Sequence, residues 1–222
     1  MPFDKTLTHA LYNTATALPS KVALTKSFWA GGPWHAERAG QVVQWFVFQY
    51  GGPDSPEFGI LASFRSEADR TAHYDDVLAG VVRKHREGLL EGKPLQAPAN
   101  ILSNNITSKS LPAVGVSLFF QAKQGQTEAV REFLSKGILS ALEADKDTRY
   151  WYAYEVPQGA DVTTPWPEQQ FAVFAFFDDV WARKRSLAGP VTQALGRSAE
   201  QLLEKFPQIN TFTVMQGYVK QE

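Results

Sequence analysis

Phe58-Gly-Ile-Leu-Ala-Ser-Phe64 and Phe171-Ala-Val-Phe-Ala-Phe-Phe177 are two versions of one strand-like segment, and the likeness continues on both sides of them. Further matches in this ungapped register are Arg70 with Arg183, Leu89-Leu90-Glu91 with Leu202-Leu203-Glu204, and Pro94 with Pro207. A similarity that extends from strand to helix predicts one structural unit built twice. We therefore expect two halves, residues 1–106 and 107–222.

The second half shows the expected order of elements most clearly. Its segments are a strand at 114–121, a helix from Thr127, strands at 149–156 and 170–177, a helical segment after Asp178 and Asp179 that Gly189-Pro190 interrupts, and a strand at 209–219. Strands are indicated by β-branched and aromatic content, and helices by apolar residues at helical spacing. The order strand, helix, strand, strand, helix, strand is that of the ferredoxin-like arrangement.

The middle strands of this half, 150–154 and 171–177, are apolar or aromatic on both faces. Such a sheet must be covered on both sides. Helices cover one face in a ferredoxin-like unit, so the other half of the chain must cover the second face. The expected fold class is α+β, with tandem ferredoxin-like repeats forming an intrachain dimeric α+β barrel.

The start of the first half departs from this pattern. Residues 22–30 can supply the first strand, but 31–40 is short and glycine-rich, which argues against a full helix. We expect the segment 7–18 to be a helix that takes the missing one's place. The segment 31–40 is then either a lid over the barrel mouth or a solvated connector. After it, strands are expected at 42–50 and 57–64, a helix at 66–91 and an edge strand at 100–106.

Composition excludes several classes of function. The net charge of -1, without a basic face, argues against nucleic acid and against a membrane surface as partners. No cysteine is present, and the first residues do not resemble a secretion signal, so we expect a cytoplasmic protein. The four histidines have no common metal-ligand spacing, and no glycine-rich phosphate loop follows a strand. We expect neither metal nor cofactor.

Three segments of the second half carry a family resemblance: 119–130, 148–154 and Leu187-Ala-Gly-Pro-Val-Thr-Gln-Ala-Leu195. Together with 171–179 they resemble the antibiotic-biosynthesis-monooxygenase-like family. The resemblance implies short ferredoxin-like chains that dimerise into an α+β barrel, here with two copies fused. It implies less about function, because the shared segments are largely structural and members include cofactor-free monooxygenases, haem-degrading enzymes and chains without assigned activity.

Members of this family often carry a histidine early in the helix after the third strand, and His73 in Thr71-Ala-His-Tyr-Asp-Asp76 matches it. Ser186 takes the same register position in the second half, so at most one competent site is expected. Cofactor-free oxygenation needs a base, a dry aromatic pocket and donors that hold a phenolate. His73 is the candidate base, with Asp75 or Asp76 to orient it. The alternative is that His73 is a solvated or capping residue.

Aromatic residues are the candidates for binding a flat substrate. The proposed substrate-binding residues are Trp29, Trp34, His35, Trp45, Tyr74, Trp151 and Tyr152. Trp45 and Trp151 occupy equivalent strand positions, so a core role is the alternative for both. The expected partner is a small aromatic molecule, and a homodimer is compatible with the sequence. The leading hypothesis is a cofactor-independent monooxygenase or related enzyme that acts on an aromatic, polyketide-like metabolite in a barrel cavity beside His73. The competing hypothesis is a non-catalytic small-molecule-binding or assembly protein whose barrel is filled by its own side chains.

Overall fold

The computed structural model describes residues 4–74, 77–157 and 170–220. The first half contains β1 (His9–Thr16), α1 (Val22–Trp29), α2 (Gly32–Ala39), β2 (Gln44–Tyr50), β3 (Glu57–Phe64), α3 (Glu67–Tyr74), α4 (Val77–His85) and β4 (Leu95–Ile106). The second half contains β5 (Val114–Phe120), α5 (Thr127–Glu132), α6 (Leu139–Ala144), β6 (Thr148–Glu155), β7 (Phe171–Phe177), α7 (Val180–Leu187), α8 (Pro190–Leu202) and β8 (Ile209–Val219). Short 3-10 turns lie at Pro19–Lys21 and Arg86–Gly88, and a π-helical turn at Phe133–Gly137 joins α5 to α6.

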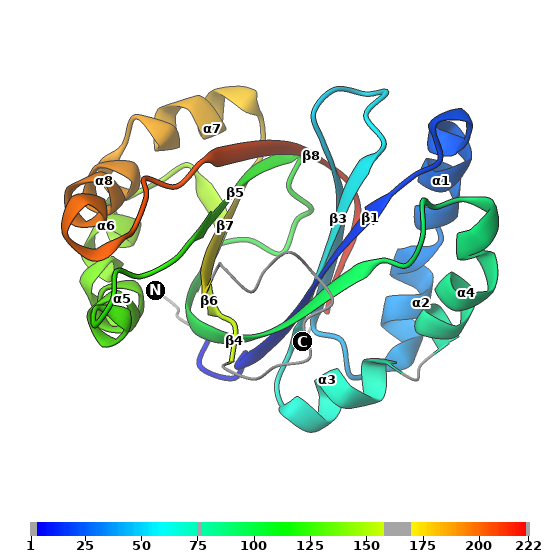
Figure 1. Ribbon diagram of the computed structural model, residues 1–222, viewed down its shortest axis with the longest axis horizontal. Coiled ribbons are helices and arrows are strands. Elements are labelled where there is room, and N and C mark those ends of the chain that lie inside the picture. Colours follow the sequence, from blue (N-terminus) through cyan, green and yellow to red (C-terminus); the bar gives the residue numbers. More distant parts are fainter. Residues whose placement is uncertain (1–3, 75–76, 158–169, 221–222) are drawn as a thin grey trace.

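In the described chain, eight antiparallel strands close into a barrel in the order β1-β3-β2-β8-β5-β7-β6-β4. Figure 1 shows α1–α4 on one side of the barrel and α5–α8 on the opposite side. The two halves meet twice, where β2 pairs with β8 and where β4 pairs with β6. The expected α+β barrel is confirmed, with each helical layer covering its own half.

The same contacts occur in both halves at the register of the sequence match. Arg70 Nη1 donates to Ala99 O at 2.9 Å, and Arg183 Nη1 donates to Phe212 O at 3.5 Å. Equivalent pairs elsewhere are Trp45 with Ala62 and Trp151 with Ala175 in the sheet, and the bridges of Ala17 with Leu90 and of Ala122 with Leu203. From β3 and β7 onward, the ungapped alignment therefore pairs residues that make similar contacts in the two halves, whereas Trp45 with Trp151 and Ala17 with Ala122 correspond at other offsets.

The N-terminal expectations were wrong. Residues 7–18 contain the strand β1 instead of a helix, and 22–30 forms α1 instead of a strand. β1 pairs with β3 on one side and β4 on the other and is buried on both faces. Four consecutive residues, 10–13, are buried, so the strand lacks the alternation of apolar and polar residues that marks a half-buried strand.

The glycine-rich segment 31–40 is the helix α2 and not a lid or a connector loop. A Cβ atom at Gly32 would lie 2.2 Å from Cη2 of Trp45, so glycine allows the helix to approach the barrel wall closely. The first half thus has helices between its first two strands. Two further boundaries differ: the helix expected over 66–91 is divided into α3 and α4, and β4 is paired on both sides rather than being an edge strand.

The inside of the barrel is packed with side chains from both halves. Phe174 lies among the rings of Tyr12, Phe48, Phe119 and Tyr154, at centroid distances of 5.1 to 6.1 Å. The other large buried side chains of this interior cluster are Phe46, Leu61, Tyr150, Tyr152, Phe176 and Phe212. The sequence predicted a substrate cavity inside the barrel, but this interior is filled by side chains. None of the described helices has the length and apolar character needed to cross a membrane.

Candidate active site

A cavity of about 410 Å³ lies between the barrel wall and the helices of the first half. Side chains of β1, β2 and β3 form one wall, and those of α1, α3 and α4 face them. The lining residues are Leu11, Asn13, Trp29, Trp45, Ile60, His73, Tyr74, Val82, Arg83, Arg86, Lys93, Pro94, Leu95 and Gln96. A mainly apolar cavity with a few polar groups, of this size, is typical of small-molecule sites.

Alternation along the strands decides which side chains reach the cavity. Successive residues of a strand point to opposite faces. On β1, Leu11 and Asn13 line the cavity, while Tyr12 belongs to the barrel interior. On β2, Trp45 lines the cavity, while Phe46 is an interior residue. The side chains on one face of the barrel wall thus fill the interior, and those on the other face line the cavity.

His73 lies on α3 and is 6% exposed, so the solvated alternative is wrong. Its ring lies 5.3 Å from the ring of Phe64, the last residue of β3. Two contacts position the helix: the Ser66 hydroxyl accepts from the Asp69 N–H at its start, and Arg70 binds the carbonyl of Ala99 in β4. The imidazole is therefore held against the sheet by a fixed helix.

Two other lining residues have a buried polar atom without a hydrogen-bond partner among the described residues. These atoms are Asn13 Oδ1, an acceptor, and Trp29 Nε1, a donor. An unsatisfied buried group destabilises a protein by roughly 1–3 kcal/mol, so native structures keep few of them. A ligand that offers both a donor and an acceptor would relieve this deficit. Trp151 Nε1 in the second half is unsatisfied too, so the observation supports the site without defining it.

The proposed site residues lie in different parts of the molecule. His73, Trp29, Trp45 and Tyr74 lie together around the cavity. Trp34 and His35 do not line it: Trp34 is 55% exposed, and its ring contacts the His35 ring at 4.7 Å and the Arg38 guanidinium at 4.5 Å. Trp151 lines a smaller cavity in the second half. Asp75 and Asp76 lie outside the described residues.

Tyr152 is a residue of the barrel interior, where its hydroxyl donates to Oε1 of Gln44. Burial raises the pKa of Tyr152 well above its usual value. Nearby, burial raises the pKa of Tyr50 to about 12, and its hydroxyl is linked to those of Tyr12 and Ser117 at 3.0 and 2.9 Å. These phenols stay neutral at ordinary pH. They stabilise the interior as hydrogen-bonding groups and do not act as bases there.

Sequence reasoning missed the polar residues Asn13, Gln96 and the basic group Arg83, Arg86 and Lys93. Asn13 was hidden because its segment was assigned to a helix. The basic residues follow His73, in or just after the helix expected at 66–91. Charged residues on such a helix ordinarily indicate its solvent-exposed face, so they were not singled out. The comparison of the two halves could have identified them, because uncharged residues, Gly196, Ala199 and Phe206, occupy the corresponding positions of the second half.

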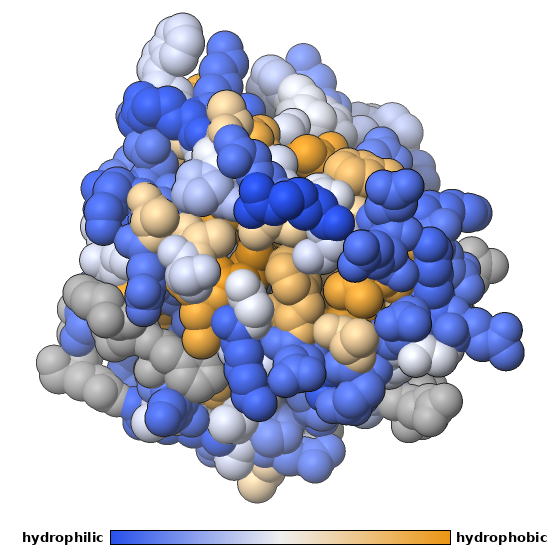
Figure 2. Space-filling model, turned by 90° about the vertical axis from the view of Figure 1, so that its left-hand side faces the viewer, coloured by the Kyte–Doolittle hydropathy of each residue, from blue (hydrophilic) through white to orange (hydrophobic). Residues whose placement is uncertain are grey.

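The corresponding cavity of the second half is nearly filled and has a volume of about 40 Å³. Trp151 takes the place of Trp45, but the helix-side residues Leu187, Val191 and Leu195 close the space. Figure 2 looks onto this helical side and shows apolar residues reaching the surface in the middle of a hydrophilic frame. The second half therefore offers a packed core where the first half offers space.

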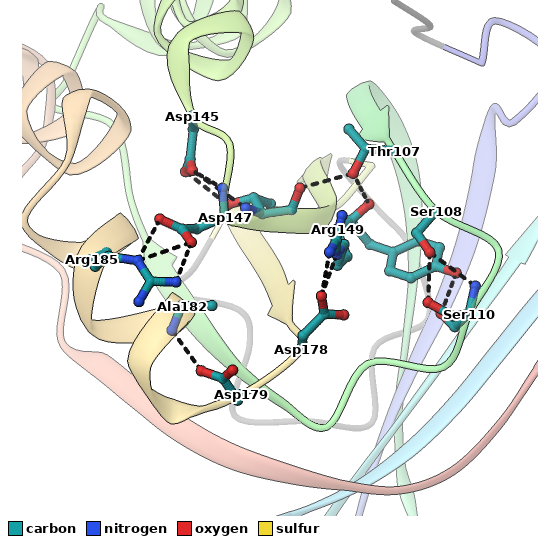
Figure 3. A network of polar contacts seen from close by, with 12 residues as sticks. Thr107, Ser108, Ser110, Asp145, Asp147, Arg149, Asp178, Asp179, Ala182 and Arg185 are labelled. Atoms are coloured by element: carbon teal, nitrogen blue, oxygen red, sulfur yellow. Dashed lines mark hydrogen bonds and ion pairs between the residues drawn. The ribbon is translucent and has the colours of Figure 1, made fainter.

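In the second half, Ser186 takes the position that corresponds to His73 and binds a buried carboxylate, that of Asp145. Ser186 Oγ donates to Asp145 Oδ2 at 2.6 Å, and Thr148 Oγ1 donates to the same oxygen at 2.8 Å. Figure 3 shows the ion pairs around it, Arg185 with Asp147 and Arg149 with Asp178, which tie α7 and its N-terminal turn to β6 and the residues before it. The polar groups in these contacts are paired with one another, so we interpret them as a structural element of the second half.

Within the described ranges, no three histidine or carboxylate side chains come together as metal ligands. No family model matches this chain, and no curated relative matches it.

Similar solved structures define the fold. A putative monooxygenase from Lactobacillus acidophilus superposes with a TM-score of 0.76 at 6% identity, covering 96% of each chain. A putative monooxygenase from Fusobacterium nucleatum gives 0.75 at 11% identity, covering 96% of this chain and 95% of that one. An anthrone oxidase-like protein gives 0.60 at 16% identity, covering 95% and 92%. These structures and a putative chlorite dismutase (TM-score 0.59, 12% identity, covering 93% and 94%) are dimeric α+β barrel proteins, and this chain has their fold.

Proposed function

We propose that the chain is a cofactor-independent monooxygenase, or a related enzyme, that acts on an aromatic metabolite in the first-half cavity. One observation carries the proposal: a buried histidine, His73, lies in a ligand-sized cavity with two tryptophan rings. We further propose that the chain is a fusion of two ferredoxin-like copies, of which only the first kept a site. The recurrence of similar contacts in the two halves supports this history.

The reaction would use the substrate as the source of electrons. His73 removes a proton from a phenol or an activated ring carbon, and the resulting anion passes one electron to dioxygen. The two radicals combine into a peroxide, which loses water to give a quinone, so one oxygen atom stays in the product and the other leaves as water. The apolar walls keep bulk water away from these species, and Tyr74 is the candidate hydroxyl donor to the developing oxyanion.

The competing proposal is a non-catalytic protein that binds a small molecule in the same cavity. The packed barrel interior favours this proposal, because a barrel filled by its own side chains is what we expect of a binding or assembly protein. The two proposals differ in turnover and not in binding. Oxygen uptake with a panel of hydroquinones, anthrones and naphthols separates them, because the binding protein consumes none.

The decisive variant is His73→Gln. Loss of a general base lowers turnover by roughly 10² to 10⁴, and the loss shrinks at higher pH because the substrate then ionises by itself. His85→Gln is the matched control: this histidine is exposed, follows on the next helix and is not a lining residue. Thermal melting of both variants checks that the fold is kept. An unchanged rate in a folded His73→Gln protein removes His73 from the mechanism.

A further inference from the structure

We infer that the ligand of the first-half cavity is an aromatic anion, whose rings lie against the apolar part of the lining and whose negative group is bound by Arg86 and Lys93. The inference deepens the proposed function and rests on the same cavity. It starts from the charge of the lining. Fourteen described residues line the cavity; three of them are basic, Arg83, Arg86 and Lys93, and none of the fourteen is an aspartate or a glutamate.

The three basic groups differ in how they are engaged. Arg83 is exposed, and its Nη1 donates to the carbonyl of Tyr74 at 2.8 Å, so part of its capacity is used. Arg86 is half-buried in the turn after α4, and Lys93 is exposed just before β4. In the described part of the chain, the side chains of Arg86 and Lys93 form no ion pair and no hydrogen bond. Both therefore remain available to a ligand.

The second half shows that this charge is not a requirement of the fold. In the register of the repeat, Arg83, Arg86 and Lys93 correspond to Gly196, Ala199 and Phe206, and Pro94 corresponds to Pro207. Gly196, Phe206 and Pro207 line the nearly filled cavity, which has no charged residue in its lining. The same framework thus carries basic groups where a cavity is open and apolar or small groups where it is closed.

The chemistry of these groups selects the ligand. A guanidinium binds a carboxylate through two parallel N–H···O bonds, and a lysine adds a second positive charge. Such attraction is stronger beside an apolar cavity than in open water, because the local dielectric constant is lower. The apolar walls in turn favour rings over a small inorganic anion. An aromatic carboxylate, or a phenolate, satisfies both parts of the lining.

The test compares 2-naphthoate with its neutral counterpart 2-naphthamide, by calorimetric titration of the full chain. We expect 2-naphthoate to bind more tightly, and added salt to weaken the binding of 2-naphthoate alone. Arg86→Gln should raise the Kd of 2-naphthoate roughly 5- to 10-fold, and Lys93→Gln about 2- to 5-fold because that side chain is exposed. Neither variant should change the Kd of 2-naphthamide.

The matched control is Arg197→Gln, an exposed cation on α8 outside both cavity linings, which should leave both Kd values unchanged. Equal affinity for the two probes, no binding of either, or an unchanged preference in Arg86→Gln and Lys93→Gln would each overturn the inference. Neither probe carries an ionisable phenol, so the titration does not depend on turnover. Selective naphthoate binding without oxygen uptake from any substrate would refute the oxygenase and leave the anion site standing.

Discussion

The two helical layers lie on equivalent walls of one barrel, yet one encloses about 410 Å³ and the other about 40 Å³. The walls are alike: Trp45 and Trp151 face the two cavities from corresponding strand positions. The difference comes from the helix side, where α8 brings Val191 and Leu195 against the sheet. The comparison teaches that the barrel supplies a scaffold and that the helices decide whether it carries a site.

The largest effect should come from truncating the two corresponding tryptophans. Trp151→Ala removes a ring from a filled core and should lower the free energy of unfolding by about 3–5 kcal/mol. Trp45→Ala should lower it by a similar amount, because this ring is fully buried and packs against Gly32 of α2, but it should also weaken ligand binding in the first-half cavity. Denaturant unfolding and ligand titration of both variants measure the two effects. An unchanged ligand Kd in a folded Trp45→Ala protein would mean that this ring does not contact the ligand.

A smaller effect should follow from Asp145→Ala. The Asp145 carboxylate accepts from Ser186 and Thr148, and its removal leaves both buried hydroxyls without this acceptor. We expect the free energy of unfolding to fall by about 1–3 kcal/mol, while binding in the first-half cavity stays unchanged. Urea titration and ligand titration of one preparation test both statements. Weakened binding would show that the two sites are coupled through the barrel.

The smallest effect concerns acid and the helices that follow β3 and β7. Backbone N–H groups of Ala182 and Trp181 bind the Asp179 carboxylate and lower its pKa. The folded pKa lies below the unfolded one, so this contribution is present above the ordinary aspartate pKa and is lost as the pH falls through the folded value.

Ser66, the corresponding residue before α3, accepts its bond through a hydroxyl that does not titrate in this range. Amide exchange, corrected for its intrinsic pH dependence, should therefore accelerate in acid at Trp181 and Ala182 more than at Asp69. Asp179→Asn should remove the acid-dependent part of this acceleration. If Asp69 accelerates to the same extent, general acid unfolding explains the change and the cap does not.

The sequence predicted the barrel because strand periodicity and the repeat are local signals that survive in one chain. It misplaced the beginning of the first half, since β1 is buried on both faces and α2 holds a glycine for contact with Trp45. Of the proposed site residues, His73, Trp29, Trp45 and Tyr74 line the cavity; the family resemblance suggested His73, and residue type suggested the other three. Asn13 and Arg86 were not proposed, because their place in the lining depends on which face of a strand or turn meets the cavity, and that requires tertiary structure.

The pairing of β2 with β8 has a consequence for synthesis on the ribosome. β8 follows every other strand of the described chain, so the outer edge of β2 stays unpaired until all of them have been made. An open strand edge next to exposed aromatic rings is a site for pairing with other chains. The nascent first half therefore carries an incomplete sheet, and its protection from aggregation rests on the arrival of the last strand or on a chaperone that covers this edge.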